Sequence, residues 1–265
     1  MRAASALSTH PIVASALGEC VGQVLDALDG ARPELVLVAV TPPHLGTLED
    51  VGGALGGLLE PDVVVGAVAS AVIGAGRLVR DEPALVLFAL HGVAASPLLL
   101  VPDGAGGLLR HGDDHQATAA VVLADPYSCS GPALAGAFEG VAACGGLSAV
   151  ARGPGGSRLL LDGAVRTSGA VGALLGPPAR AVASPGGRRG PLEVEADLAA
   201  TLAPSGFRLI AGLIFPGEDR DGDAHLASEL VGVPVAGVGV RRPLAPRAGR
   251  TSLHGAGATG LALFP

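Results

Sequence analysis

Residues 34–66 read ELVLVAVTPPHLGTLEDVGGALGGLLEPDVVVG, and this stretch decides the fold. After Glu34, residues 35–40 form a continuous apolar run, typical of a strand buried on both faces, and Thr41-Pro42-Pro43 ends that strand. A helix is predicted over Leu48–Leu59, followed by a second strand that ends in Val64-Val65-Gly66. Two strands joined by a crossover helix lie parallel in one sheet, so the stretch predicts an α/β fold.

The same pattern recurs twice further along the chain. Residues 120–124 begin a second copy, with Asp125-Pro126, a helix over residues 133–141, and Gly145-Gly146. Residues 209–215 begin a third, with a helix near residues 224–230 and a strand that ends at Gly237. Closing strands are predicted over residues 84–90, 170–175 and 260–264. We therefore predict mixed sheets built from three repeated strand–helix–strand–strand units with flanking helices.

The amino-acid composition limits the class of protein and weakens any inference from glycine-based motifs. The 265 residues are 49% hydrophobic and 15% charged, which argues against disorder and coiled coil. With 42 glycines, 21 prolines and no lysine or asparagine, the chain shows the bias of a GC-rich genome, and recurrence by composition alone is the alternative to a true repeat. A net charge of −7 argues against nucleic acid or an anionic membrane as partner.

The apolar runs and the cysteines indicate the cellular compartment of the protein. The longest apolar stretch, residues 63–75, is too short to span a membrane, which needs about 20 apolar residues. Cys20, Cys129 and Cys144 form no CxxC pair and fit a reducing compartment. We expect a cytoplasmic protein with no membrane span. The Pro/Gly-rich stretch over residues 177–191 is predicted to be a linker, dividing the chain into domains 1–185 and 186–265.

A series of short stretches, spread over most of the chain, is informative through the order in which the stretches occur. They are residues 7–11, 35–40 with Pro43-His44, 65–77, 123–126, 145–149, 156–163, 169–172, 249–250, 253–255 and 261–264. In this order they resemble the FIST proteins, bacterial sensory proteins with an N-terminal and a C-terminal FIST module. The resemblance makes residues 1–185 a FIST N-like domain of two units and residues 186–265 a shortened FIST C-like domain of one unit.

Several polar motifs of the family are changed here. Its glycine-cysteine-arginine-proline motif falls on Gly186-Gly187-Arg188-Arg189, without the cysteine, and its phenylalanine-serine-cysteine stretch falls on Phe215-Pro216-Gly217. Its early cysteine-threonine pair is Ala67-Val68, and a motif glutamate is Pro243. A long family segment is also missing near Glu193. These differences indicate a shortened and diverged member of the family.

Ligands of α/β sheets bind beyond the carboxyl ends of the strands, where loops carry polar groups. The predicted ligand-binding residues, of which Arg158 and His254 come from the resemblance, are His44, Gly66, Asp125, Gly146, Arg158, Arg220 and His254. Arginine binds a carboxylate bidentately and aspartate accepts from an ammonium group, so the set suits an amino acid. The resemblance implies the same, because the family is proposed to sense small ligands. The alternative is that Asp125-Pro126 and Pro42-Pro43 merely end strands and cap helices.

No enzyme, metal or cofactor is predicted. The sequence has no GxSxG elbow, no Walker A loop and no Rossmann fingerprint in the right context. His111-Gly112-Asp113-Asp114-His115 holds metal-ligating side chains, but a glycine-flanked loop lacks the rigidity of a metal site and is predicted to be solvated. Cys144 reads as a small buried residue.

Three functional hypotheses remain open. The first is a non-enzymatic sensory protein that binds a small polar ligand and relays its presence to a separate signalling protein. The second is a degenerate scaffold that assembles with partners and binds no ligand. The third is a haem-binding nitric oxide sensor, as the resemblance allows, with an axial ligand among His44, His91, His225 and His254. An aromatic content of 2% disfavours haem. Convergence of Asp125, Arg158, Arg220 and His254 on one cleft would favour the first hypothesis over the second.

Overall fold

The computed structural model describes residues 1–265 except 113–115, 184–210, 217–234, 248–249, 254–257 and 264–265. The first unit comprises β1 (Arg2–Ser8), α1 (Val13–Ala27), β2 (Leu35–Val40), the 3₁₀ helix η1 (Pro42–Thr47), α2 (Leu48–Leu59), β3 (Val63–Val68), β4 (Ala71–Gly74), β5 (Arg77–Arg80) and β6 (Leu85–His91). The second comprises β7 (Ala95–Pro102), β8 (Leu108–His111), β9 (Ala119–Ala124), α3 (Gly131–Ala137), β10 (Ala142–Ser148), β11 (Leu159–Leu161), β12 (Ala164–Arg166) and β13 (Ala170–Leu175). The third comprises β14 (Ala179–Ala183), β15 (Ala211–Pro216), β16 (Val235–Val238), β17 (Val240–Arg247), β18 (Arg250–Leu253) and β19 (Ala258–Leu263).

The described strands confirm the predicted mixed α/β fold and its threefold repeat. Each unit has a parallel pair (β2 with β3, β9 with β10, β15 with β16) and a closing strand antiparallel to the first member of the pair (β6, β13, β19). In the first two units a described helix connects the parallel strands. The predicted helix over Leu48–Leu59 and the closing strand over Ala170–Leu175 are confirmed to the residue. The helix expected near residues 224–230 lies outside the described residues.

Each sheet is completed by a hairpin from a different unit. The described sheets have the strand orders β1-β6-β2-β3-β11-β12, β18-β17-β10-β9-β13-β7-β8 and β14-β19-β15-β16-β4-β5. Hairpin β4–β5 of the first unit therefore joins the third sheet, β11–β12 of the second joins the first, and β17–β18 of the third joins the second. The three units are interlocked in a cycle, and no described sheet is the product of one unit alone.

A glycine in each receiving strand makes room for the exchanged hairpin. A Cβ on Gly66 of β3 would lie 2.6 Å from the Val38 carbonyl oxygen and 3.3 Å from a methyl group of Leu160 in β11. A Cβ on Gly237 of β16 would lie 2.5 Å from Ile73 of β4, and one on Gly146 of β10 would lie 2.7 Å from Val240. At Gly146 and Gly237 the exchanged hairpin thus lies where a side chain would be, whereas at Gly66 the tightest contact is with Val38 of the neighbouring strand β2.

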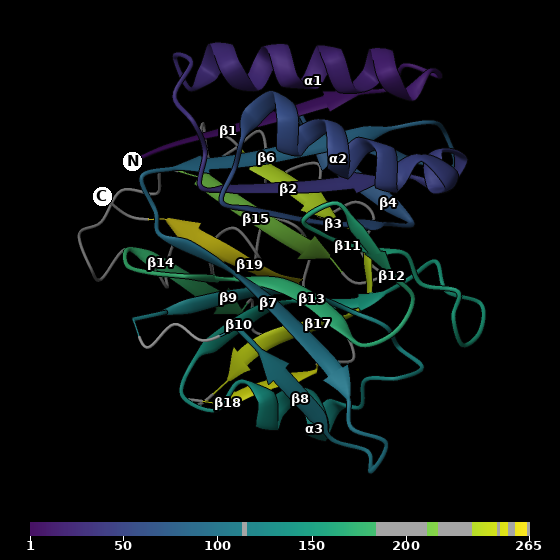
Figure 1. Ribbon diagram of the computed structural model, residues 1–265, viewed down its shortest axis with the longest axis vertical. Helices are drawn as coiled ribbons and strands as arrows, with labels where there is room; N and C mark the ends of the chain where they lie inside the picture. Colours follow the sequence, from purple (N-terminus) through teal and green to yellow (C-terminus); the bar gives the residue numbers. More distant parts are fainter. Residues whose placement is uncertain (113–115, 184–210, 217–234, 248–249, 254–257, 264–265) are drawn as a thin grey trace.

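Alternate residues of the buried strands fill two separate layers of core. In β2, Leu35 and Leu37 face a central core shared with β9, β13 and β16, whereas Val36 and Val38 face α1 and α2. Burial on both faces explains the unbroken apolar runs in the sequence. In Figure 1, α1 and α2 lie side by side over the first sheet, and α3 lies at the opposite end beside β8 and β18.

Some expectations were wrong in detail. The helix expected over residues 133–141 ends at Ala137, because the chain turns through Gly140 at a φ of +84°. The stretch expected as a linker contains strand β14, which pairs with β19. Strands from both sides of residue 185 pair in two of the described sheets, and the division into two domains stays a prediction. Neither β1, α1 nor the three exchanged hairpins were predicted.

We expect substitution of a glycine in a strand that pairs with an exchanged hairpin to change stability differently from substitution of a glycine that faces open space. Gly66→Ala places a methyl group against the backbone of Val38, and we expect it to lower the free energy of unfolding by about 1–3 kcal/mol. Gly56→Ala in α2 meets nothing within 4 Å, and we expect a gain of about 0.5–1 kcal/mol from helix propensity. Urea unfolding of both variants checks the pair. A Gly66→Ala variant as stable as the wild type would refute the close approach.

Candidate functional site

In the first two units, the residue after the first strand of the parallel pair is hydrogen-bonded to the segment that leads into the closing strand. Thr41 follows β2, and its hydroxyl accepts a hydrogen bond from the Ala84 amide at 2.8 Å while donating to the Glu82 carbonyl at 2.6 Å. Asp125 follows β9 in the equivalent position. The backbone repeats as well, since the Thr41 amide donates to Ala84 O at 3.0 Å and the Asp125 amide to Gly169 O at 2.8 Å.

Asp125 is fully buried and both of its carboxylate oxygens are occupied. Oδ1 accepts from the Ser157 hydroxyl and Oδ2 from the Ser128 hydroxyl, each at 2.6 Å. Ser128 in turn accepts from the Gly169 amide at 2.8 Å. One carboxylate therefore ties together the loop after β9, the loop before β11 and the residue that precedes β13. Two charge-assisted hydrogen bonds offset the cost of burying the charge.

Arg158 lies beside Asp125 through its neighbour Ser157. Its Nη1 donates to the carbonyls of Gly155 at 3.0 Å and Ser157 at 2.9 Å. Its own carbonyl accepts from the Val68 amide at 3.1 Å, at the carboxyl end of β3. Within the described residues no hydrogen bond reaches Nε or Nη2 of Arg158, so part of the guanidinium is free to bind an anion. The structure thus brings two of the predicted site residues together where β3 ends.

His44 is placed at the same end of the first sheet. It lies in η1, which packs against both β2 and β3, and its amide donates to the Thr41 carbonyl at 2.9 Å. The side chain is 4% exposed, and its Nε2 has no hydrogen-bond partner among the described residues. Ser148, the last residue of β10, shares this property, with 6% exposure and an unpartnered hydroxyl. Sequence reasoning did not single out Ser148 as a ligand residue.

The predicted glycines and the remaining residues fall elsewhere. Gly66 and Gly146 lie within β3 and β10, where they admit the exchanged hairpins, so packing explains both, and a ligand role stays a prediction. Arg220 and His254 lie outside the described residues, as does His225. Whether all four discriminating residues share one cleft therefore stays a prediction, and Asp125 and Arg158 are the pair that the structure brings together.

Metal and thiol chemistry find no support in the described part of the chain. Residues 113–115 of the histidine-aspartate loop lie outside it, and within it no three His, Cys, Asp or Glu side chains could hold a metal ion. Burial raises the pKa of the Cys20 thiol to about 12 and that of Cys129 to about 11. Burial also raises the pKa of Cys144. All three thiols are protonated near neutral pH, unlike nucleophilic cysteines.

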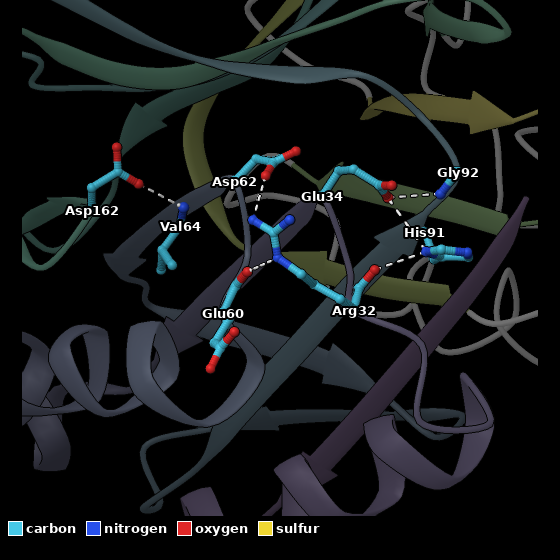
Figure 2. Close-up of polar contacts among 8 residues, drawn as sticks. All are labelled: Arg32, Glu34, Glu60, Asp62, Val64, His91, Gly92 and Asp162. Atoms are coloured by element: carbon cyan, nitrogen blue, oxygen red, sulfur yellow. Dashed lines mark hydrogen bonds and ion pairs between the residues drawn. The ribbon is translucent and has the colours of Figure 1, made fainter.

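A second polar cluster lies at the opposite, amino end of the first sheet (Figure 2). Arg32 forms an ion pair with Asp62 at 2.5 Å and also donates to the Glu60 carbonyl, joining the loops that precede β2 and β3. Glu34 accepts from the Gly92 amide at 2.7 Å. These contacts bind neighbouring loops to one another. The cluster has a structural explanation and holds the ends of β2, β3 and β6 in place.

Asp162, also drawn in Figure 2, fastens the exchanged hairpin of the second unit. It lies in the turn between β11 and β12 with a φ of +48°. Its Oδ1 accepts from the Val64 amide at 2.8 Å, and its own amide donates to the Val64 carbonyl at 2.9 Å. Burial raises the pKa of the Asp162 carboxyl, although the hydrogen bond from Val64 opposes that effect.

The FIST N domain family model matches residues 34–188 of this chain, which covers the first parallel pair, the whole second unit and the Asp125–Arg158 network. The chain therefore belongs to the FIST family, a family of sensory, signal-transduction domains. It is 32% identical over 184 residues to the uncharacterized protein Mb0898c of Mycobacterium bovis, covering 66% of this chain and 47% of that protein. It is 30% identical over the same length to the uncharacterized protein MT0656 of Mycobacterium tuberculosis, covering 66% of this chain and 48% of the relative. The chain spans about half the length of these relatives.

Among the helices of the described residues, none combines the length and apolar character needed to cross a bilayer.

We expect Asp125 to contribute to the stability of the ligand-free protein. Asp125→Ala leaves the hydroxyls of Ser128 and Ser157 without their acceptor, and we expect the free energy of unfolding to fall by about 3 kcal/mol. Tyr127→Phe, in the same loop, removes only a 3.4 Å contact to the Ala151 carbonyl and should change stability by less than about 0.5 kcal/mol. Denaturant unfolding compares the two. Equal stability of both variants would contradict a structural role for Asp125.

Asp162 should give a pH-dependent contribution with a defined sign. Its pKa in the folded chain is raised, so its contribution to stability is fully present below the unfolded value of 3.8 and is lost as pH rises through the folded value. Asp162→Asn keeps an acceptor for the Val64 amide and has no charge to bury. We expect this variant to be at least as stable as the wild type at pH 7, with the difference shrinking as pH falls towards 4.

The matched control is Asp162→Ala, which also lacks the charge but removes the acceptor, and its free energy of unfolding should be lower than that of Asp162→Asn by about 1 kcal/mol at both pH values. Thermal melts across this pH range separate the variants. If Asp162→Asn lost as much stability at pH 7 as Asp162→Ala, the stated effect of burial on the carboxyl would be wrong.

Proposed function

We propose that this chain is a FIST-type sensory protein that binds a small polar ligand, with amino acids as the first class to test. Its role is non-enzymatic: ligand binding at the carboxyl ends of β3 and β10 is relayed to a separate signalling protein in the cytoplasm. The observation that carries the proposal is the Asp125–Ser157–Arg158 connection. It fixes Arg158, whose Nε and Nη2 have no hydrogen-bond partner among the described residues, at the sheet edge where α/β proteins bind their ligands.

Family membership supports the sensory part of this proposal, and the buried thiols support the non-enzymatic part. A cysteine nucleophile needs a lowered pKa, whereas burial raises the pKa of Cys20, Cys129 and Cys144. The Ser128 hydroxyl donates to the Asp125 carboxylate and accepts from the Gly169 amide, and no hydrogen bond joins it to a histidine of the described residues. These thiols and this hydroxyl therefore favour a protein that binds its ligand without catalysing a reaction.

A second candidate function is an assembly scaffold without a ligand. It is favoured by one specific observation, the full occupation of Asp125 by two serine hydroxyls, since a carboxylate committed to the fold is less available to a ligand. Gly66 and Gly146, explained by packing, point the same way. The scaffold would act through contacts with partner proteins.

Thermal melts in the presence of each free amino acid separate the two candidates. Because the chain has no tryptophan, unfolding is followed by circular dichroism or a dye. A ligand at a hundredfold over its Kd stabilises by about 2.7 kcal/mol, which for this chain length is a rise of about 5–10 °C in Tm. We expect a selective rise with a subset of the panel. A cooperative melt that no compound shifts would overturn the sensory proposal in favour of the scaffold.

A further inference from the structure

The groups that a ligand would meet differ from those expected of an amino-acid site. An amino-acid site needs a cation for the carboxylate and an acceptor for the ammonium group. Arg158 supplies the cation. Asp125, the expected acceptor, is 0% exposed and accepts from Ser128 and Ser157 through both oxygens, so it serves the fold and not the ammonium.

Three buried polar atoms have no hydrogen-bond partner among the described residues: His44 Nε2, Ser148 Oγ and Ser96 Oγ. His44 and Ser148, which are 4% and 6% exposed, follow or end the strands β2 and β10 at their carboxyl ends, whereas Ser96 pairs with Leu174 at the other end of the second sheet. Each such atom destabilises the free protein, because it has lost water and gained no hydrogen bond. A bound ligand would restore the missing bonds.

Chain connectivity links these residues to the end of β3. Ser148 ends β10, and the loop that follows runs to Arg158, whose carbonyl is bonded to the Val68 amide at the end of β3. Along this loop Ala151 accepts from Tyr127, and Val150 packs against the same core as Leu45 of η1. The 3₁₀ helix that carries His44 packs against β3. The end of β3 therefore contacts the segment of Arg158 and the helix of His44, and the loop after Ser148 leads to the same region.

From these observations we propose that the ligand is recognised as a carboxylate anion, with Arg158 binding the charge and Ser148 and His44 supplying neutral hydrogen bonds. The proposal rests on the sensory function above and deepens it. An α-ammonium group is not required. The buried charge of Asp125, one residue removed from Arg158 through Ser157, disfavours a phosphate dianion relative to a singly charged carboxylate.

Paired ligands test the proposal directly. Each amino acid of the melting panel is compared with its deaminated acid, for example alanine with propionate, and inorganic phosphate is included. We expect the deaminated acid to raise Tm at least as much as its parent amino acid, and phosphate to raise it less. A panel in which amino acids shift Tm and their deaminated acids do not would overturn the proposal while leaving the sensory function intact. No shift from either class would mean that the sensory function itself has failed.

Substitutions at Arg158 and Ser148, with one at Arg152 as the control, test whether the ligand-induced rise in Tm depends on the proposed contacts. Arg158→Gln should remove most of the shift, whereas Arg152→Gln, an equal change of charge at an exposed position of the same loop, should preserve it. Ser148→Ala should leave the Tm of the ligand-free protein unchanged or raised, because it deletes an unpartnered hydroxyl, and should reduce the ligand-induced shift. Loss of stability in ligand-free Ser148→Ala, or an undiminished shift in Arg158→Gln, would contradict the assigned contacts.

Discussion

Backbone pairing between β3 and β11 is the interaction on which the rest of the described structure depends. It joins a hairpin of the second unit to the sheet of the first, and the equivalent pairings of β4 with β16 and β17 with β10 complete the cycle. The side chains reinforce the pairing, since Leu160 is fully buried against Gly66 and Gly52. A unit that lost its borrowed hairpin would expose both a strand edge and the core beneath it.

The same pairing creates the candidate site. Ser157 and Arg158 immediately precede β11, so docking of this strand on β3 brings them to the carboxyl end of the first sheet. Asp125 then fixes the loop from the side of the second sheet through Ser157. Residues of the second unit thus reach the end of β3 in the first unit because a hairpin is exchanged, and a fold with each hairpin retained in its own sheet would not bring them there. The FIST N match, which extends over both units, is consistent with a site that neither unit forms alone.

How much could be predicted from the sequence differs between the long buried strands and the short exchanged ones. The runs at residues 35–40 and 119–124 are apolar throughout, and their spacing from a glycine-bearing strand recurs, so the parallel pairs and closing strands were predictable. Two of the three exchanged hairpins occupy the residues between β3 and β6 and between β10 and β13, in strands of three or four residues that carry no clear period. The third, between β16 and β19, has strands of eight and four residues. Which sheet receives a hairpin is a long-range choice that local pattern does not encode.

In the candidate site, too, local sequence pattern predicted some features, whereas others depend on long-range contacts. Asp125 was predictable as a polar residue at a strand end and Arg158 from the family resemblance, whereas the bond between Asp125 and Ser157 joins loops 32 residues apart in sequence. Ser148 carries no signal in the sequence, because an unpartnered hydroxyl is recognised only from its surroundings. The helix α1 was predictable in principle: its buried residues Ala16, Leu17, Cys20, Val21 and Val24 follow the helical period.

Hydrogen exchange of the intact chain in increasing denaturant tests the interlocked cycle most directly. If the units depend on one another's hairpins, the amides of β3, β11 and β10 will exchange through one opening reaction with a common free energy and a common dependence on denaturant. Opening of β11–β12 at much lower free energy than β3, with the first sheet still protected, would show that the exchanged hairpin is an accessory and would contradict this account.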